Sequence, residues 1–106
     1  MVKKTILNRL KKFHQLLLKE GVEVSALVLY GSYARGTAHR DSDIDVCVVS
    51  PQFGKDRFEE GVFLRHISGR VHALIEPVPC SLKDYQKNKV SPLLHEIRKE
   101  GITVFH

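Results

Sequence analysis

Two short apolar runs most constrain the fold of this 106-residue chain. Val24–Tyr30 is aliphatic and β-branched and stops at a glycine; Asp43–Val49 is similar and is closed by Ser50-Pro51. Runs of this length, bounded by turn residues, are typical of buried β-strands. They are far shorter than the roughly 20 apolar residues that a membrane-spanning helix needs. We therefore expect the core to be built around a sheet.

Helical patterns flank these runs. Over Val2–Glu20 the apolar residues recur at helical spacing, opposite a lysine-rich face: Ile6, Leu10, Phe13 and Leu17. The next expected elements are a short helix or turn at Tyr33–Gly36, a polar loop at 37–42 and a helix at Phe58–Ile67. A strand at Val71–Val78 follows and is stopped by Pro77 and Pro79. The last elements are a helix capped by Ser81, a helix from Ser91-Pro92 to Glu100 and a strand at Ile102–Phe105. This order predicts an α+β fold, a small sheet with helices packed on it.

The composition is that of one globular domain spanning residues 1–106. The chain is 42% apolar and 27% charged, which argues against disorder. No apolar stretch or small-residue cleavage site follows the charged start Met1–Lys4, so no signal peptide is expected. Two cysteines make no disulfide framework, and Cys47 sits in an apolar run as a small buried hydrophobe. We expect residence in the cytoplasm, without a membrane.

The net charge of +5 allows a polyanionic partner without requiring one. Six basic residues lie on the first predicted helix: Lys3, Lys4, Arg9, Lys11, Lys12 and Lys19. Interleaved aromatic side chains of the kind that stack on bases are missing there. A solvated basic surface and a nucleic-acid contact both stay open, and no Cys/His spacing resembles a zinc site.

The chemically informative stretch begins where the first predicted strand ends, at Gly31-Ser32. Because glycine has no Cβ, backbone amides there can approach a phosphate closely. A helix beginning at this point would add amide donors and a favourable dipole. The Ser32 hydroxyl can donate to a phosphate oxygen without bringing charge. The turn is therefore a candidate phosphate cradle.

Asp43 follows Ser32 after ten intervening residues, and Asp45 lies two positions farther on. Residues i and i+2 of a strand point to the same face, about 6 to 7 Å apart along the chain. Two carboxylates in one place repel each other unless a cation lies between them. Hard oxygen ligands of this kind suit Mg²⁺ or Mn²⁺, which takes further ligands from water and substrate phosphates.

Each half of this pattern has a simpler explanation when taken alone. Gly-Ser after a strand is commonly just a turn, and Asp-Ser-Asp before an apolar run is commonly a cap. The combination favours a site, because Asp45 lies inside an apolar strand between Ile44 and Val46, where an uncompensated charge is costly.

With these residues the chain resembles the minimal nucleotidyltransferases of the DNA polymerase β-like superfamily, whose signature is Gly-Ser, ten residues and Asp-x-Asp. The residues that match the family's pattern are Gly31, Ser32, Arg35, Gly36, Ser42, Asp43, Ile44 and Asp45. The resemblance covers nearly the whole chain. It implies a nucleotidyltransferase fold, with a small mixed sheet and helices packed mainly on one face.

The resemblance also implies a two-metal transfer of a nucleotidyl group, with ATP as substrate. Asp43 and Asp45 would hold Mg²⁺ (or Mn²⁺) against the triphosphate, while Gly31 and Ser32 would hold its β and γ phosphates. Arg35 is a candidate contact to the nucleotide. Arg40 and His39 are further candidates for neutralising charge, although solvated loop residues are an equally simple explanation.

Family members use a third carboxylate on a neighbouring strand, and Glu76 is the candidate here. Its parity is opposite to that of Ala73 and Ile75, so it is expected to point out of the core towards the aspartates. It would share the metal and help deprotonate the acceptor hydroxyl. Aspartate is common at this place in the superfamily, and a strand-end glutamate before proline also suits an exposed surface position. His72 is expected to be structural.

Minimal nucleotidyltransferases are often paired with a small helical HEPN protein, a toxin that they neutralise by attaching AMP to a tyrosine. The resemblance thus suggests an antitoxin role with a HEPN partner. A non-catalytic module that binds nucleotide or partner, and a small-molecule nucleotidyltransferase, are the alternatives. A domain this small has no room for a second lobe, so acceptor binding is expected to need a partner or a second copy.

Overall fold

The computed structural model describes residues 2–87 and 91–106. The strands are β1 (Ala26–Tyr30), β2 (Ile44–Ser50), β3 (Ile75–Ser81) and β4 (Ile102–Phe105), and the helices are α1 (Lys4–Lys19), α2 (Ser32–Arg35), α3 (Arg57–Gly69), α4 (Leu82–Gln86) and α5 (Pro92–Glu100). This is the element order predicted from the sequence. Among the described residues, no helix is both long enough and apolar enough to cross a membrane.

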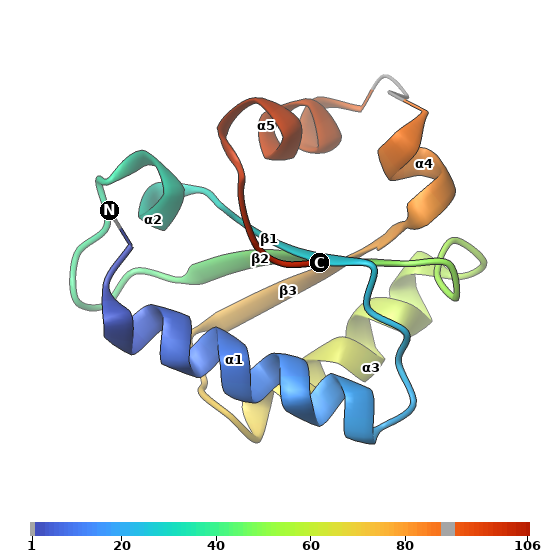
Figure 1. Ribbon diagram of the computed structural model, residues 1–106, viewed down its shortest axis with the longest axis horizontal. Helices are drawn as coiled ribbons and strands as arrows, with labels where there is room; N and C mark the ends of the chain where they lie inside the picture. The colour runs from blue at the N-terminus through green and yellow to red at the C-terminus, as the bar shows by residue number, and fades with distance from the viewer. Residues whose placement is uncertain (1, 88–90) are drawn as a thin grey trace.

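The strands form one mixed sheet in the order β3-β2-β1-β4. Strand β1 is antiparallel to both β2 and β4, whereas β2 and β3 run parallel. The two longest helices, α1 and α3, lie on one face of the sheet, and the shorter α4 and α5 lie on the other (Figure 1). The predicted α+β class with a mixed sheet is therefore confirmed, whereas the helices, expected mainly on one face, cover both faces because each face of the sheet carries apolar side chains.

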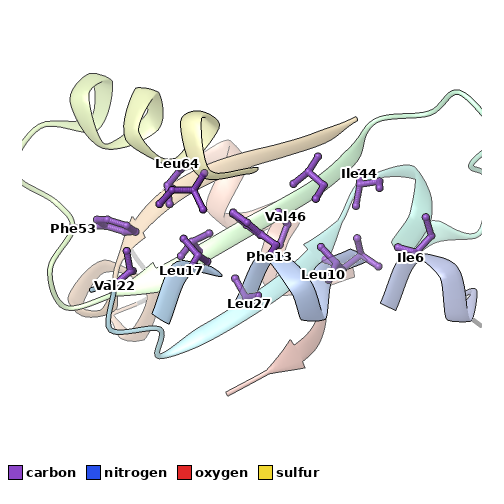
Figure 2. Close-up of a cluster of buried hydrophobic side chains, with 14 residues drawn as sticks. Ile6, Leu10, Phe13, Leu17, Val22, Leu27, Ile44, Val46, Phe53 and Leu64 are labelled. Atoms are coloured by element: carbon purple, nitrogen blue, oxygen red, sulfur yellow. The ribbon is translucent and has the colours of Figure 1, made fainter. Parts of the chain in front are cut away.

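The face beneath α1 and α3 carries the larger core (Figure 2). The apolar stripe of α1 is buried as predicted: Ile6, Leu10, Phe13 and Leu17. It packs against Leu27 and Val46 of the sheet, with Leu64 of α3 in the same cluster. Each fully buried side chain of this size stabilises the fold by about 1.5–3 kcal/mol. The stripe therefore fixes α1 on the sheet.

The opposite face carries a smaller cluster under α4 and α5, made of Ala26, Val28, Tyr30, Cys47, Val49 and Ile97. Side chains of a strand alternate between the two faces. Since Ile44 and Val46 enter the larger core, Asp45 between them faces the α4 and α5 side. This parity decides on which face the candidate site lies.

Strand β3 departs from the prediction at its C-terminal end. Pro77 and Pro79, expected to stop it, lie inside it. They fit because β3 is an edge strand, paired only with β2. The two prolines are two residues apart, so both missing N–H groups fall on the same side of the strand, and an edge tolerates them on its unpaired side. The prolines leave one edge of the sheet poor in donors.

The start of the third strand was also predicted wrongly. Val71 and His72, expected in the strand, lie in the turn that follows α3, and both amides donate to the Ser68 carbonyl at 2.9 Å. His72 also accepts from the Leu74 amide through Nδ1 at 3.1 Å, which agrees with the structural role expected for it. Apolar and β-branched composition alone did not distinguish this turn from a strand.

The two predicted caps after β3 are confirmed. The Ser81 side chain accepts from the Asp84 amide at the start of α4, and the Ser91 side chain accepts from Leu94 at the start of α5. Pro92 occupies the first turn of α5, where its missing N–H has no partner to lose. These caps hold the two short helices that border the candidate site.

Candidate functional site

Gly31 joins the two halves of the sequence motif. It follows β1 with φ 74° and ψ −150°, a conformation that L side chains rarely adopt. A Cβ built at this position would collide with the carboxylate of Asp45 and lie 3.1 Å from its Cγ. Tyr30 pairs with Asp45 across the antiparallel β1–β2 ladder, which explains the close approach. The glycine turn and the aspartate are thus in direct contact.

The turn at Gly31 leads straight into helix α2. The Gly31 carbonyl accepts from the amides of Ala34 and Arg35 at 3.1 and 3.0 Å. The first amides of a helix, here those of Ser32 and Tyr33, have no intrahelical acceptor. They directly follow Gly31, whose Cα side faces the Asp45 carboxylate. This geometry suits a phosphate oxygen approaching between the turn and a bound cation.

The three predicted carboxylates come from two neighbouring strands. Asp43 immediately precedes β2 and is exposed, whereas Asp45 is partly buried in it. Glu76 on β3 is exposed and is the register partner of Asp45. Partners on adjacent strands share a face, so Glu76 lies beside Asp45, on the face that sequence parity predicted.

Several acidic side chains lie near Asp45. Burial raises its pKa above the ordinary value, and the nearby charges of Asp43, Glu76 and Glu96 raise it further, whereas Arg35 acts in the opposite direction. Desolvation and like charges both penalise the ionised carboxylate. A cation at this point would relieve both effects.

The carboxylates do not form a ready-made metal cage. Within residues 2–87 and 91–106, no three His, Cys, Asp or Glu side chains are gathered closely enough to hold an ion. Mg²⁺ in nucleotide sites commonly takes one or two carboxylates and completes its shell with water and phosphate. Asp43 and Asp45 therefore fit an ion that arrives with its substrate.

Arg35, the candidate nucleotide contact, forms ion pairs with helix α5. Its Nη1 lies 3.2 Å from Glu100 Oε2 and 3.6 Å from Glu96 Oε1, both on α5. We call these three residues the α5 clasp. All three side chains are 35–43% exposed, so the pairs are weak and open to exchange with a phosphate.

Sequence reasoning missed Glu96 and Tyr30 as neighbours of the site. Glu96 is 51 residues from Asp45 in the chain, and its charge still reaches Asp45 and Tyr30. Burial, followed by the charge of Asp45, raises the pKa of the Tyr30 phenol. The one available signal was the spacing of Glu96 and Glu100, which puts both on one face of a predicted helix.

The remaining loop residues have structural roles or lie on the surface. Ser42, which matches the family pattern, accepts through Oγ from the His39 amide at 2.9 Å. His39 also accepts through its carbonyl from Ser42 and through Nδ1 from Asp41. This compact turn sets the position from which Asp43 enters the site. Arg40 is exposed in the same loop.

Comparison with known proteins agrees with this geometry. Residues 4–102 match the model of the nucleotidyltransferase domain family. The chain belongs to this family. The matched region of the nucleotidyltransferase contains Gly31-Ser32 and the paired aspartates, and the enzyme class predicted from the sequence is confirmed at the level of the family.

One relative of this nucleotidyltransferase is a Methanocaldococcus jannaschii protein provisionally named a protein adenylyltransferase. It is 31% identical over 99 residues, which span 89% of this chain and 67% of the relative. A second M. jannaschii protein with the same kind of name is 38% identical over 47 residues, 44% of this chain and 47% of its own length. The first match extends over most of the domain.

Solved structures share the fold. A nucleotidyltransferase from Sulfolobus solfataricus, also identified provisionally, superposes with a TM-score of 0.66 at 17% identity, covering 93% of this chain and 78% of that one. A toxin–antitoxin complex with AMP-PNP gives 0.57 at 22% identity, covering 93% and 72%. A complex of a tri-AMPylated Shewanella oneidensis HEPN toxin with an MNT antitoxin gives 0.55 at 17% identity, covering 94% and 71%.

Proposed function

We propose that this nucleotidyltransferase is a Mg²⁺-dependent protein adenylyltransferase that transfers AMP from ATP to a hydroxyl group of a partner protein. The observation that carries the proposal is the contact between Gly31 and the Asp45 carboxylate. It brings the proposed phosphate-binding turn next to a carboxylate that has other acidic side chains around it. Neither motif half alone requires this approach.

In the proposed reaction, Ser32 and the neighbouring amides bind the β and γ phosphates and orient the triphosphate. Asp43 and Asp45 would hold Mg²⁺, or Mn²⁺, beside them. The ion supplies charge neutralisation at the phosphates and a lowered pKa for the attacking hydroxyl. The crowded carboxylates then favour the loaded state over the empty one, because the added positive charge offsets their mutual repulsion.

Glu76 would hold the acceptor hydroxyl and take up its proton. Its exposure leaves the carboxylate open to an incoming side chain, and it is the register partner of Asp45, one of the two proposed metal ligands. The hydroxyl oxygen attacks the α phosphorus, the bond from that phosphorus to the bridging oxygen breaks, and pyrophosphate leaves. A carboxylate one methylene longer than aspartate retains the acceptor-only chemistry that this step needs.

We propose a HEPN-type toxin as the acceptor, so that the chain acts as an antitoxin in the cytoplasm. Two comparisons support this: relatives named as protein adenylyltransferases, and a similar structure in which an MNT antitoxin accompanies an AMPylated HEPN toxin. The shallow, exposed position of Glu76 suits a protruding protein side chain. A second copy of the chain is the other expected source of acceptor contacts.

A binding module without turnover is the second candidate. Glu76 is exposed, as an ordinary surface residue would be, and nucleotide binding by the Gly31-Ser32 turn would need no group to take up an acceptor proton. In that case the domain would sequester its partner, and Glu76 would have no chemical role.

Labelled ATP distinguishes these functions. The chain is incubated with Mg²⁺, ATP labelled on the α phosphate and the product of the adjacent gene. Label on a hydroxyl of the partner, lost in Asp45→Asn and reduced at least tenfold in Glu76→Gln, supports the proposal. Tight partner binding that survives both substitutions without any labelled partner would overturn it in favour of the binding module.

A further inference from the structure

A cavity of about 230 Å³ opens between the sheet and helices α4 and α5, and Gly31 and Ser32 are not among its lining residues. Its lining includes both cysteines of the chain and two charged residues: Cys47, Cys80, Arg57 and Asp84. None of the motif residues discussed above is among its lining residues. The cavity therefore exposes chemistry that the proposed transfer reaction does not use.

Both cysteines of the chain meet in this cavity as free thiols. Cys47 is fully buried in β2, and Cys80 on the neighbouring β3 is partly exposed. In the parallel ladder Cys47 pairs with Val78, and Cys80 lies two residues farther along the same strand. Residues two apart share a face, so both thiols point to the α4 and α5 side.

We propose that Cys47 and Cys80 are a redox-sensitive thiol pair, in which a peroxide oxidises Cys80 and Cys47 then closes a disulfide between β2 and β3. The partly exposed thiol on the cavity wall is the attacking group. The buried thiol behind it is the resolving group.

The surroundings of the two thiols favour Cys80 as the attacking group and Cys47 as the resolving group. Cys80 is partly exposed on the cavity wall, whereas Cys47 is fully buried behind it, and the hydrogen bond with Cys47 lowers the pKa of Cys80. The Cys80 S–H itself donates to the Ser81 carbonyl at 3.4 Å. The positive charges of Arg57 and Arg98 also favour the Cys80 thiolate, while burial and the charge of Asp84 oppose it. The thiolate is the nucleophile towards peroxides.

The cationic groups come from two different helices. Arg57 begins α3 and lines the cavity. Arg98 of α5 lies over the ring of Tyr85 of α4, with its guanidinium carbon 5.2 Å from the ring centroid. This contact ties the two helices that cover the thiol pair. The positive field at Cys80 is therefore a feature of the assembled fold, absent from the local sequence.

The chemistry balances with one peroxide molecule. The Cys80 thiolate attacks a peroxide oxygen, an S–O bond forms, the O–O bond breaks, and the leaving hydroxide takes a proton to become water. Sulfur loses two electrons and the peroxide gains them. The Cys47 sulfur then attacks the Cys80 sulfur, the S–S bond forms, the S–O bond breaks, and the departing hydroxide takes the Cys47 proton as a second water.

The position of β3 at the edge of the sheet allows the closure. A disulfide needs Cα atoms within about 7 Å of each other, and Cys80 lies on the neighbouring strand, two residues beyond the register partner of Cys47. Because β3 is paired on one side only, a small shift that brings Cys80 closer to Cys47 would disturb no second ladder. The crosslink would lie two residues from Asp45 on β2 and four from Glu76 on β3.

Treatment of the full chain with hydrogen peroxide tests the proposal. We expect the intact mass to fall by two hydrogen atoms, to return after reduction with dithiothreitol, and to map to a peptide joining Cys47 and Cys80. Cys47→Ala should instead leave a sulfenic acid on Cys80 that dimedone traps. Stepwise addition of oxygen at Cys80 in the wild type, with no linked peptide, would overturn the pair.

Alkylation by iodoacetamide supplies an independent measurement. Cys80 should react several-fold faster than glutathione at the same pH, and Arg57→Gln should slow it several-fold. Arg65→Gln, an exposed arginine on the same helix, is the matched control and should leave the rate unchanged. Equal rates in wild type and Arg57→Gln contradict the proposed activation. If Cys47→Ala does not fold by circular dichroism, the linked peptide from the wild type decides the outcome.

Discussion

At Gly31 two separate requirements exclude a side chain. The backbone occupies a region open essentially to glycine alone, and the Asp45 carboxylate fills the space that a Cβ would need. We expect Gly31→Ala to lower the free energy of unfolding by about 1–3 kcal/mol and to abolish ATP binding, because the turn must move away from Asp45. Urea unfolding and calorimetric titration measure the two effects.

Gly36→Ala is the matched control for this prediction. Gly36 also has a positive φ, 77°, but a Cβ there would meet no atom within 4 Å. Its cost is the left-handed backbone alone, about 1–2 kcal/mol, with ATP affinity retained. Equal loss of binding in both variants would show that backbone strain, and not the contact with Asp45, governs the site.

Asp45 makes stability depend on pH. Its pKa is raised in the folded chain by burial first and then by neighbouring carboxylates, so the folded state binds the proton more tightly than the unfolded state does. Stability is therefore lost as pH rises from the unfolded value, about 3.9, through the raised folded value. Asp45→Asn should raise the melting temperature by a few degrees at pH 7 and leave it unchanged at pH 3.

Asp41→Asn removes a carboxylate from the exposed loop nearby and controls for net charge. It should leave the melting temperature the same at both pH values. A gain in Asp45→Asn that persists at pH 3 would mean that the substitution acts through packing and not through charge.

At the scale of elements, the α5 clasp joins helix α2, which carries Arg35, to helix α5, which carries Glu96 and Glu100. The two ion pairs hold Arg35 on α5, where a triphosphate must compete for it. Glu100→Gln should free Arg35 and tighten Mg²⁺–ATP binding several-fold, while stability changes by less than about 1 kcal/mol, as is usual for exposed pairs. Titration calorimetry with ATP measures the affinity.

A second exposed ion pair provides the comparison for the clasp. Arg70 lies 3.5 Å from Glu20 on a part of the surface formed by α1 and α3. Glu20→Gln should leave ATP affinity unchanged. Unchanged affinity in Glu100→Gln as well would mean that Arg35 does not reach the phosphates.

For the whole molecule, ligand binding should appear as added stability. At a free concentration 100 times its Kd, a ligand specific to the folded state stabilises it by about 2.7 kcal/mol. Mg²⁺ with ATP should therefore raise the melting temperature of the wild type, and Asp43→Asn should remove most of the increase. Differential scanning fluorimetry measures it, and an unchanged wild-type melt at millimolar ligand would count against the site.

Much of the fold was predictable because its signals are local. The helical stripe of α1, the strand that ends at Gly31 and the serine caps at Ser81 and Ser91 each depend on residues close in the chain. Strand β3 was misplaced because Pro77 and Pro79 carry opposite meanings in central and edge strands. Whether a strand lies at an edge is a property of the sheet order, which no local pattern contains.

The sequence by itself determined which residues are the candidates for the chemistry: a glycine followed by serine, two aspartates at strand spacing, and a third acid of the right parity. The tertiary structure decided their surroundings. It put Gly31 in contact with Asp45 and set Glu76 in register with Asp45. It also paired Arg35 with α5 and brought the two cysteines together under α4 and α5. The physical reason is that motif spacing is written along the chain, whereas charge, burial and contact depend on which distant elements pack on the same face of the sheet.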